Sequence, residues 1–263
     1  MDPRIIFEDQ ALLCIDKPSG MTVNRSETTI HEKTVQDWAE GYLGITKESR
    51  VPRAPQISPG DGVTEEYDPL DAFYERAGIV HRLDKETSGL LLIGKTEEGF
   101  LGLQKQFKER TMQKTYIALA HGRLLPKTGE IEVPVGRLPW DRHKFGIVAG
   151  GREAVTQYTV LRFYTRTDDK QKEPLSLVEL FPKTGRTHQI RVHLKYSNHP
   201  IFSDPLYSGR KTMRKDRQAL ARLFLHAAKL TLMHPVTHLP LSLESDLPSD
   251  LAVFVASRLV EIE

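Results

Sequence analysis

Residues 81–93 read HRLDKETSGLLLI, a polar, glycine-ended turn that runs directly into four large apolar residues. Asp84 lies in this turn between two basic residues, Arg82 and Lys85. The apolar run predicts a buried strand. An aspartate at this position is either a structural cap for the turn or a reactive carboxylate at the rim of a core. Composition alone favours a cap that pairs with Lys85.

The same stretch also matches a phosphate-binding loop on paper. Residues 89–96 read GLLLIGKT, which fits GxxxxGK[ST]. That loop wraps phosphates with backbone N–H groups, so its middle should be a loop that follows a strand. Here the middle is four large apolar residues, which predict the strand itself. The sequence contains neither GxGxxG nor the GxSxG pattern of a nucleophile elbow.

Outward from this turn, the pattern is many strands with a few helices. Alternation and β-branched or aromatic residues predict strands at 5–7, 11–16, 90–93, 114–121, 130–135, 154–164, 175–181 and 225–232. Helical spacing predicts helices at 34–43, 97–110, 187–196 and 250–261, with N-caps at Thr34, Thr96 and Ser249. Such a mixture predicts an α+β protein with a mainly antiparallel sheet.

Length and composition indicate one soluble domain. The 263 residues suit a single domain over 1–263, and the Pro/Gly-rich, aperiodic residues from about 46 to 71 predict a mobile surface insertion. The longest apolar runs are too short to span a membrane, and the N-terminus lacks the shape of a signal peptide. A single cysteine, Cys14, allows no disulfide framework. We therefore expect a cytoplasmic protein.

Charge is distributed unevenly along the chain. Residues 181–229 hold eleven Lys and Arg and two acidic residues, a net charge of +9, whereas the remainder holds 26 against 33, a net of −7. This asymmetry predicts a surface that faces a polyanion. The alternative is a solvated basic loop around 210–217 without a partner.

Four segments concentrate polar residues next to apolar stretches, at 17–20, 81–89, 114–116 and 184–193. His188 and His193 are five residues apart and lack an accompanying carboxylate, so we expect no metal site. What remains is a carboxylate, Asp84, that could act as a nucleophile or a general base. It needs a cation to stay ionised when partly buried, and either Arg82 or Arg186 could supply the charge.

These segments resemble the motifs of the RluA-type RNA pseudouridine synthases. KPSG at 17–20 matches the first motif, 81–89 the catalytic motif, KTY at 114–116 the segment with the active-site tyrosine, and 184–193 the third motif. Residues 225–227 and 234–235 match the C-terminal signature, so the matches run in family order. Two positions differ. Asn24 stands where the first motif commonly ends in His, and SDPLYSG at 203–209 replaces the usual GDxxYG. Neither difference touches the catalytic aspartate.

The resemblance implies roles for particular residues. Asp84 would be catalytic, Arg186 would pair with it, and Tyr116 would pack on the target base. Arg82 would help to displace the flipped uridine, and Ile190 would form an apolar wall. Further substrate-binding candidates within the matched motifs are His81, Lys17 and Arg191. The expected contacts to the RNA backbone are Arg210, Lys211, Arg214 and Lys215.

The implied fold is the pseudouridine synthase catalytic fold, an extended, mainly antiparallel mixed sheet with flanking helices and a central active-site cleft. The implied activity is the isomerisation of uridines in tRNA and/or rRNA, a redox-neutral reaction that needs no cofactor. We expect a monomer that binds RNA through its catalytic domain, without a separate N-terminal RNA-binding domain. One alternative is a catalytically silent RNA-binding or ribosome-assembly factor of the same fold. Another is a hydrolase that uses Asp84 as its nucleophile, although no second carboxylate is evident for it.

Overall fold

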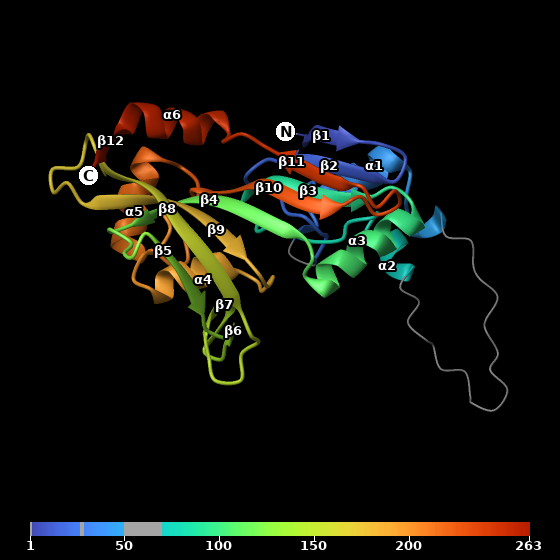
Figure 1. Cartoon of the computed structure of the whole chain (residues 1–263), viewed down its shortest axis with the longest axis horizontal. Coiled ribbons are helices and arrows are strands. Elements are labelled where there is room, and N and C mark those ends of the chain that lie inside the picture. Colours follow the sequence, from blue (N-terminus) through green and yellow to red (C-terminus); the bar gives the residue numbers. More distant parts are fainter. Residues whose placement is uncertain (1, 27–28, 50–69) are drawn as a thin grey trace.

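The structure, a computed structural model, describes residues 2–26, 29–49 and 70–263. Within these residues one large sheet runs the length of the molecule (Figure 1), and a two-stranded sheet lies beside it. The large sheet contains β1 (Arg4–Glu8), β2 (Leu12–Lys17), β3 (Ser88–Gly94), β4 (Gln113–His121), β5 (Thr128–Glu132), β8 (Val155–Arg166), β9 (Pro174–Pro182), β10 (Leu225–Met233), β11 (Pro240–Glu244) and β12 (Leu259–Ile262). The small sheet contains β6 (Val135–Leu138) and β7 (Asp141–Ile147). The helices are α1 (Val35–Leu43), α2 (Asp71–Glu75), α3 (Glu97–Glu109), α4 (Gln189–Tyr196), α5 (Arg210–Ala219), α6 (Ser249–Arg258) and the short 3-10 helix η2 (Lys47–Ser49).

The strand order along the large sheet is β1-β2-β3-β10-β4-β9-β8-β12. β11 pairs with β10, and β5 pairs with β8. The β3–β10 pair is parallel, whereas the other pairs in the sheet are antiparallel. The predicted α+β fold with a mainly antiparallel mixed sheet is confirmed.

β3 is buried on both faces, which explains its unbroken apolar sequence. Because successive side chains point to opposite faces, Leu91 and Ile93 pack toward α1, while Leu90 and Leu92 pack into a cluster with Leu103 of α3. The residues that mimic a phosphate loop are therefore a strand, as predicted. The hydroxyl of Thr96 then accepts from the Gly99 N–H and caps α3.

The parallel seam between β3 and β10 requires a glycine at the end of the turn that carries Asp84. Gly89 has φ +115°, and a Cβ placed there would lie 2.3 Å from the Ala227 carbonyl oxygen. A side chain at this position would push the two central strands apart. Gly89 thus fixes how closely the turn that carries Asp84 approaches the middle of the sheet.

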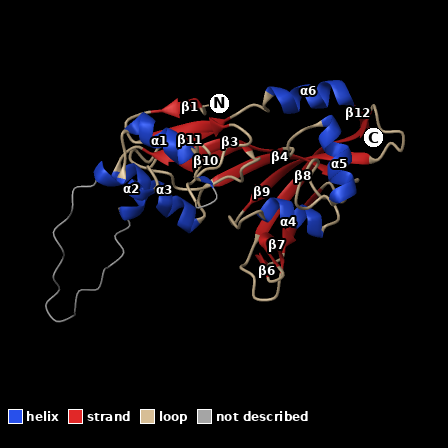
Figure 2. Ribbon diagram, turned by 180° about the vertical axis from the view of Figure 1, so that it is seen from behind, coloured by secondary structure: helices blue, strands red, loops and turns tan. Residues whose placement is uncertain are grey.

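The sheet joins two groups of elements. Figure 1 shows β1, β2 and α1–α3 at one end and β5–β9, α4 and α5 at the other, with β4 crossing between them; Figure 2 shows the same division from behind. Each end has its own apolar core. Tyr116 on β4 packs against both the core around α1 and the core around α4, so it lies at the junction.

Most predicted elements are present, with informative differences. The Thr34 cap is confirmed as a full capping box with Asp37. The predicted helix over 250–261 is too long: the chain leaves the helix at Arg258 and adds β12 to the sheet, and Pro248, not Ser249, is the N-cap. The 210–217 cluster is helical rather than a loop. Of the expected insertion, residues 50–69 lie outside the described residues. Among the helices that the structure describes, none has the length and apolar character to cross a membrane.

Candidate active site

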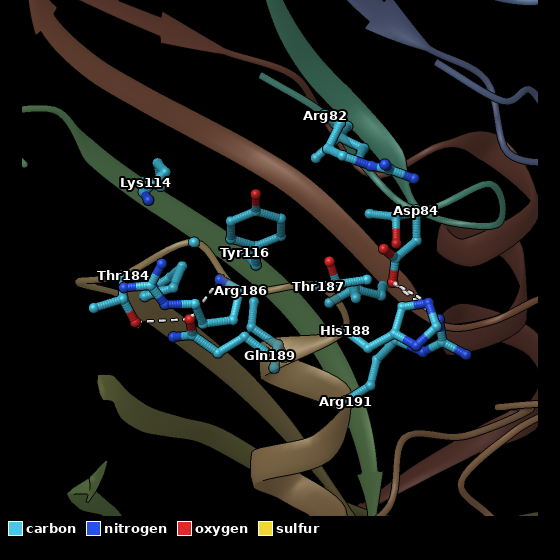
Figure 3. A pocket seen from close by; sticks show the side chains of 16 residues that line it. Arg82, Asp84, Lys114, Tyr116, Thr184, Arg186, Thr187, His188, Gln189 and Arg191 are labelled. Atoms are coloured by element: carbon cyan, nitrogen blue, oxygen red, sulfur yellow. Dashed lines mark hydrogen bonds and ion pairs between the residues drawn. The ribbon is translucent and has the colours of Figure 1, made fainter. Parts of the chain in front are cut away.

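Asp84 lies on the wall of a pocket of about 120 Å³ at the junction of the two cores. Its side chain is 19% exposed. The pocket walls come from the loop before β3, from β4 and from the segment that connects β9 to α4 (Figure 3). These segments are distant in sequence and meet because β10, β4 and β9 are neighbours in the sheet.

One oxygen of Asp84 is held by a buried arginine. Nη1 of Arg191 donates to Oδ2 of Asp84 at 2.9 Å. The same guanidinium donates from Nε and Nη2 to both oxygens of Asp204, at 2.8 and 2.9 Å. Asp204 is fully buried, and its Oδ1 also accepts from the backbone N–H groups of residues 206 and 207. Such a bidentate pair fixes the arginine in one orientation.

The charge of this arginine is secured by its two carboxylates. Burial opposes the charge on Arg191, but hydrogen bonds and attraction from Asp204, together with the attraction of Asp84, raise the pKa of the guanidinium above its usual value. A permanent cation thus faces Oδ2 of Asp84. No donor among the described residues reaches Oδ1 of Asp84, so this oxygen is available to a bound molecule.

The expectation that Arg186 pairs with Asp84 is wrong. Arg186 lies on the other side of the pocket (Figure 3), where its Nε donates to the Glu153 carbonyl oxygen at 3.0 Å. Its backbone N–H and the hydroxyl of Thr184 both donate to Oε1 of Gln189, at 2.9 and 2.7 Å. This network shapes the wall opposite Asp84. Both arginines belong to the same predicted motif. Arg191 lies on α4, which begins at Gln189, whereas Arg186 lies in the segment before this helix, and the sequence could not decide which of the two faces the carboxylate.

A histidine also faces Asp84. Nε2 of His188 lies 3.8 Å from Oδ2 of Asp84, and its Nδ1 is 2.8 Å from the Tyr207 hydroxyl. That hydroxyl accepts from the Phe145 N–H at 3.1 Å and can donate its own hydrogen to Nδ1. Burial lowers the pKa of His188 below its usual value, against the opposing charge of Asp84. A neutral imidazole therefore lies beside the carboxylate.

The floor of the pocket combines an aromatic ring, an apolar side chain and an amine. Tyr116 and Lys114 of β4 and Ile190 of α4 all line it. Burial, and then the negative charge of Asp84, raise the pKa of Tyr116, which keeps its hydroxyl protonated. Burial, with a contribution from Arg110, lowers the pKa of Lys114 to about 8.

Two predicted substrate-binding residues form hydrogen bonds with the protein's own backbone instead. Lys17 is fully buried, and its ammonium donates to the carbonyls of Pro18, Met21 and Lys85 at 2.9, 2.8 and 3.1 Å. It therefore anchors the Asp84 loop rather than the substrate. His81 accepts from the Leu92 N–H at 2.8 Å, and burial lowers its pKa to about 3. It fixes the loop against β3, outside the pocket lining.

The Asp84 loop is tied down at Glu86 as well. The hydroxyl of Ser19 donates to the Glu86 carbonyl oxygen at 2.7 Å. The Glu86 carboxylate accepts from Arg217 of α5 and from the Leu223 N–H. Arg82, by contrast, is exposed at the mouth of the pocket (Figure 3), without an ion pair to any described residue.

The predicted backbone-binding cations all lie on α5. Arg210, Lys211 and Arg214 are exposed and have no carboxylate partner among the described residues. Lys215 instead pairs with Asp169 at 3.0 Å. No group of three His, Cys, Asp or Glu that could hold a metal ion occurs in the described part of the chain.

Sequence reasoning missed Asp204, His188, Tyr207 and Lys114 as parts of this site. One detectable signal for Asp204 was its place in the segment 203–209, which corresponds to the family's GDxxYG; another is that it is one of two acidic residues in the basic segment 181–229. A buried acid among cations is expected to pair with one of them.

Comparisons with known proteins agree on one family. The sequence model for RNA pseudouridylate synthase matches residues 11–196. The chain is 36% identical over 255 residues to the ribosomal large subunit pseudouridine synthase D of Nitrosomonas europaea, covering 96% of this chain and 64% of that protein. It is 35% identical over 256 residues to the RNA pseudouridine synthase YlyB of Bacillus subtilis, covering 97% and 72%.

Among solved structures, the human RNA pseudouridylate synthase domain containing 1 superposes with a TM-score of 0.67. The two share 22% sequence identity, and the match covers 99% of this chain and 89% of the human chain. This likeness confirms the predicted fold.

Proposed function

The chain belongs to the RNA pseudouridylate synthase family, and from this premise we propose that it isomerises uridine to pseudouridine in RNA with Asp84 as the reacting carboxylate. The observation that carries the proposal is the asymmetry of Asp84. Its Oδ2 is held by Arg191, whereas its Oδ1 is unpaired among the described residues, and the residue lines a base-sized pocket. A structural cap would accept from a backbone N–H of the turn, and among the described residues no backbone N–H donates to either carboxylate oxygen of Asp84.

The reaction matches this arrangement. The bond between the sugar C1′ and N1 of uracil breaks, the ring turns, and C5 bonds to C1′, with a hydrogen lost from C5 and one gained at N1. No electrons are gained or lost overall. Oδ1 of Asp84 can attack the sugar or base, or remove a sugar proton, while Arg191 holds Oδ2 and orients the carboxylate. The pocket keeps the detached uracil beside the sugar until it is rejoined.

Tyr116 and Lys114 would act on the base. Because the Tyr116 hydroxyl stays protonated, this residue offers a ring face for stacking rather than a base for proton removal. The Lys114 ammonium lies in the same wall and can attract the negative charge that develops on a departing uracil. The target uridine must leave its stack to reach this pocket.

The backbone of the RNA would bind along α5. Arg210, Lys211 and Arg214 form an exposed row of cations on a helix that also holds Glu86 in the Asp84 loop. Replacing the three by Gln should weaken RNA binding and reduce the slope of log affinity against log salt by roughly 0.7–0.9 for each phosphate that the variant no longer binds. A matched control removes three exposed charges elsewhere, at Arg4, Lys33 and Arg162. An equal effect in both triple variants would show that α5 has no special role.

Large-subunit ribosomal RNA is the substrate that we propose to test first, because the Nitrosomonas relative is named for it. The assay is tritium release from ribosomal RNA and from transfer RNA labelled at uridine C5. Wild type should release tritium and Asp84→Asn should not, with both proteins still binding RNA. The proposal would be refuted if neither RNA released tritium with wild type, so that wild type and Asp84→Asn gave the same result. Binding without release would indicate a silent RNA-binding factor, and free uracil as the product would indicate a hydrolase.

A further inference from the structure

A second groove opens at the mouth of the active-site pocket. It has a volume of about 700 Å³ and is lined by Asn24, Arg25, Gln36, Glu75, Arg76 and Arg82. Arg82 lines both this groove and the pocket that contains Asp84, so the two are neighbours that share this side chain. None of the other residues in the groove takes part in the chemistry proposed above.

Two of the lining side chains are committed to building the walls. Arg25 donates to Asp37 at 2.6 Å and to Glu40 at 2.7 Å, so its charge is neutralised by α1. Gln36 donates to the Glu75 carbonyl oxygen at 2.7 Å and accepts from the Arg25 N–H at 3.2 Å. These bonds join α1 to the end of α2 and leave little capacity for a ligand.

Three other side chains are uncommitted. Asn24 is half-buried, and its amide makes no hydrogen bond within the described residues, so it offers both a donor and an acceptor. Arg76 and Arg82 are exposed and have no carboxylate within ion-pair distance in the described ranges. A free amide suits the edge of a base, and free guanidinium groups suit phosphates. The groove therefore combines the two chemistries that a nucleotide presents.

We propose that this groove binds the nucleotide next to the target uridine, with Asn24 hydrogen-bonded to the edge of its base and Arg76 and Arg82 in contact with its phosphates. The inference rests on the proposed function. An RNA strand whose uridine enters the Asp84 pocket must continue across the mouth of that pocket, where Arg82 already lies. Bases in unpaired RNA are read by hydrogen bonds at their edges, so Asn24 would determine which neighbour is accepted.

The test uses short transcripts that span a uridine modified by the wild-type enzyme, with each neighbouring base replaced in turn. Pseudouridine formation is measured as kcat/KM. Wild type should prefer one neighbouring base by roughly tenfold, the range of a two-bond amide–base contact. Asn24→Ala should lose the preference and act on every transcript at about the rate of wild type on the disfavoured ones. Asn24→Asp, which can only accept hydrogen bonds, should shift the preference toward bases that present an amino group.

Arg76→Ala should raise KM for all transcripts alike and flatten the salt dependence, without changing the base preference. Arg162→Ala, which removes an exposed arginine of β8 that pairs with Glu261 of β12, is the matched control and should change neither quantity. The inference is overturned if wild type shows no neighbour preference, or if Asn24→Ala keeps it. Failure of the proposed function would be recognised by a different result, in which wild type forms no pseudouridine in any transcript.

Discussion

The buried Asp204 should control catalysis without touching the substrate, and Asp204→Asn tests this. Oδ1 of Asp204 accepts three hydrogen bonds, from Arg191 Nη2 and from two backbone N–H groups, so the asparagine should place its remaining oxygen there. Its amide nitrogen then replaces Oδ2 and points a hydrogen at Nε of Arg191, which in the wild type donates at 2.8 Å. One charge-assisted hydrogen bond is removed, and two donors face each other.

The expected effects follow from these contacts. A hydrogen bond to a charged group contributes about 1.5–3 kcal/mol, and Arg191 is nearly buried, so the free energy of unfolding should fall by about 3 kcal/mol. Arg191 is also released from the clamp that orients its Nη1 toward Asp84. A displacement of the order of 1 Å at a reacting group can lower the rate about 100-fold. We therefore expect kcat to fall about 100-fold with a small change in KM, because Asp204 does not line the pocket.

The measurements are tritium release at saturating RNA for kcat, and urea unfolding for stability. Asp169→Asn is the matched control. Asp169 is also buried and accepts two backbone N–H groups and one cation, but it lies away from the pocket. It should lose comparable stability and keep its kcat. A folded Asp204→Asn enzyme with wild-type kcat would show that the Arg191 clamp does not position Asp84.

Four further outcomes are expected. Lys114 is charged only below a pKa of about 8, so kcat/KM of wild type should decline above that pH, and Lys114→Arg should move the decline to higher pH. Tyr116→Ala should lower kcat/KM roughly 5- to 150-fold because the stacking surface is removed, whereas Tyr116→Phe should stay within about threefold. Gly89→Ala should lower the free energy of unfolding by more than about 3 kcal/mol, measured in urea, because its Cβ would meet the Ala227 carbonyl at 2.3 Å. Burial lowers the pKa of Lys17 to about 7, so between pH 7 and 9 Lys17 keeps its proton in the unfolded chain but has released it in the native chain. The unfolding free energy of wild type should therefore rise by about 2 kcal/mol from pH 7 to pH 9, relative to that of Lys17→Met, as measured by urea unfolding at each pH.

The elements with local signals could be predicted from sequence. The four apolar residues at 90–93 predict a buried strand directly. The N-cap at Thr34 is also visible in the local sequence, because Asp37 stands three residues later, at the position of the capping box. The basic run at 210–217 has no apolar periodicity, and its helix is fixed by tertiary contacts such as His121 with Asp216 at 2.8 Å. β12 could not be separated from the preceding helix, because its pairing partner is β8, about 95 residues earlier, and strand pairing overrides local helix preference.

The site shows the same limit at the level of single residues. Asp84 and Tyr116 are assigned from the sequence only through the family resemblance of their segments, because composition alone favours a structural cap at Asp84. Charge alone left Arg82 or Arg186 as the partner of Asp84, the resemblance then implied Arg186, and the structure shows Arg191 instead. The choice depends on Asp204, which holds Arg191 from another segment, and on Glu153, whose carbonyl draws Arg186 away. Neither contact leaves a trace in the motif itself.

The Asp84 loop is held from three separate parts of the chain. Lys17 binds it from the first hairpin, Arg191 from α4 and Arg217 from α5, where Arg217 bonds Glu86. These elements belong to both ends of the sheet, so the position of the carboxylate depends on how the two cores meet. If RNA binds the exposed face of α5, the same helix transmits that contact to Glu86, two residues from Asp84. Binding of the RNA backbone and alignment of the carboxylate would then be linked through one short helix, whose Arg217 contacts the Asp84 loop although more than a hundred residues separate the two.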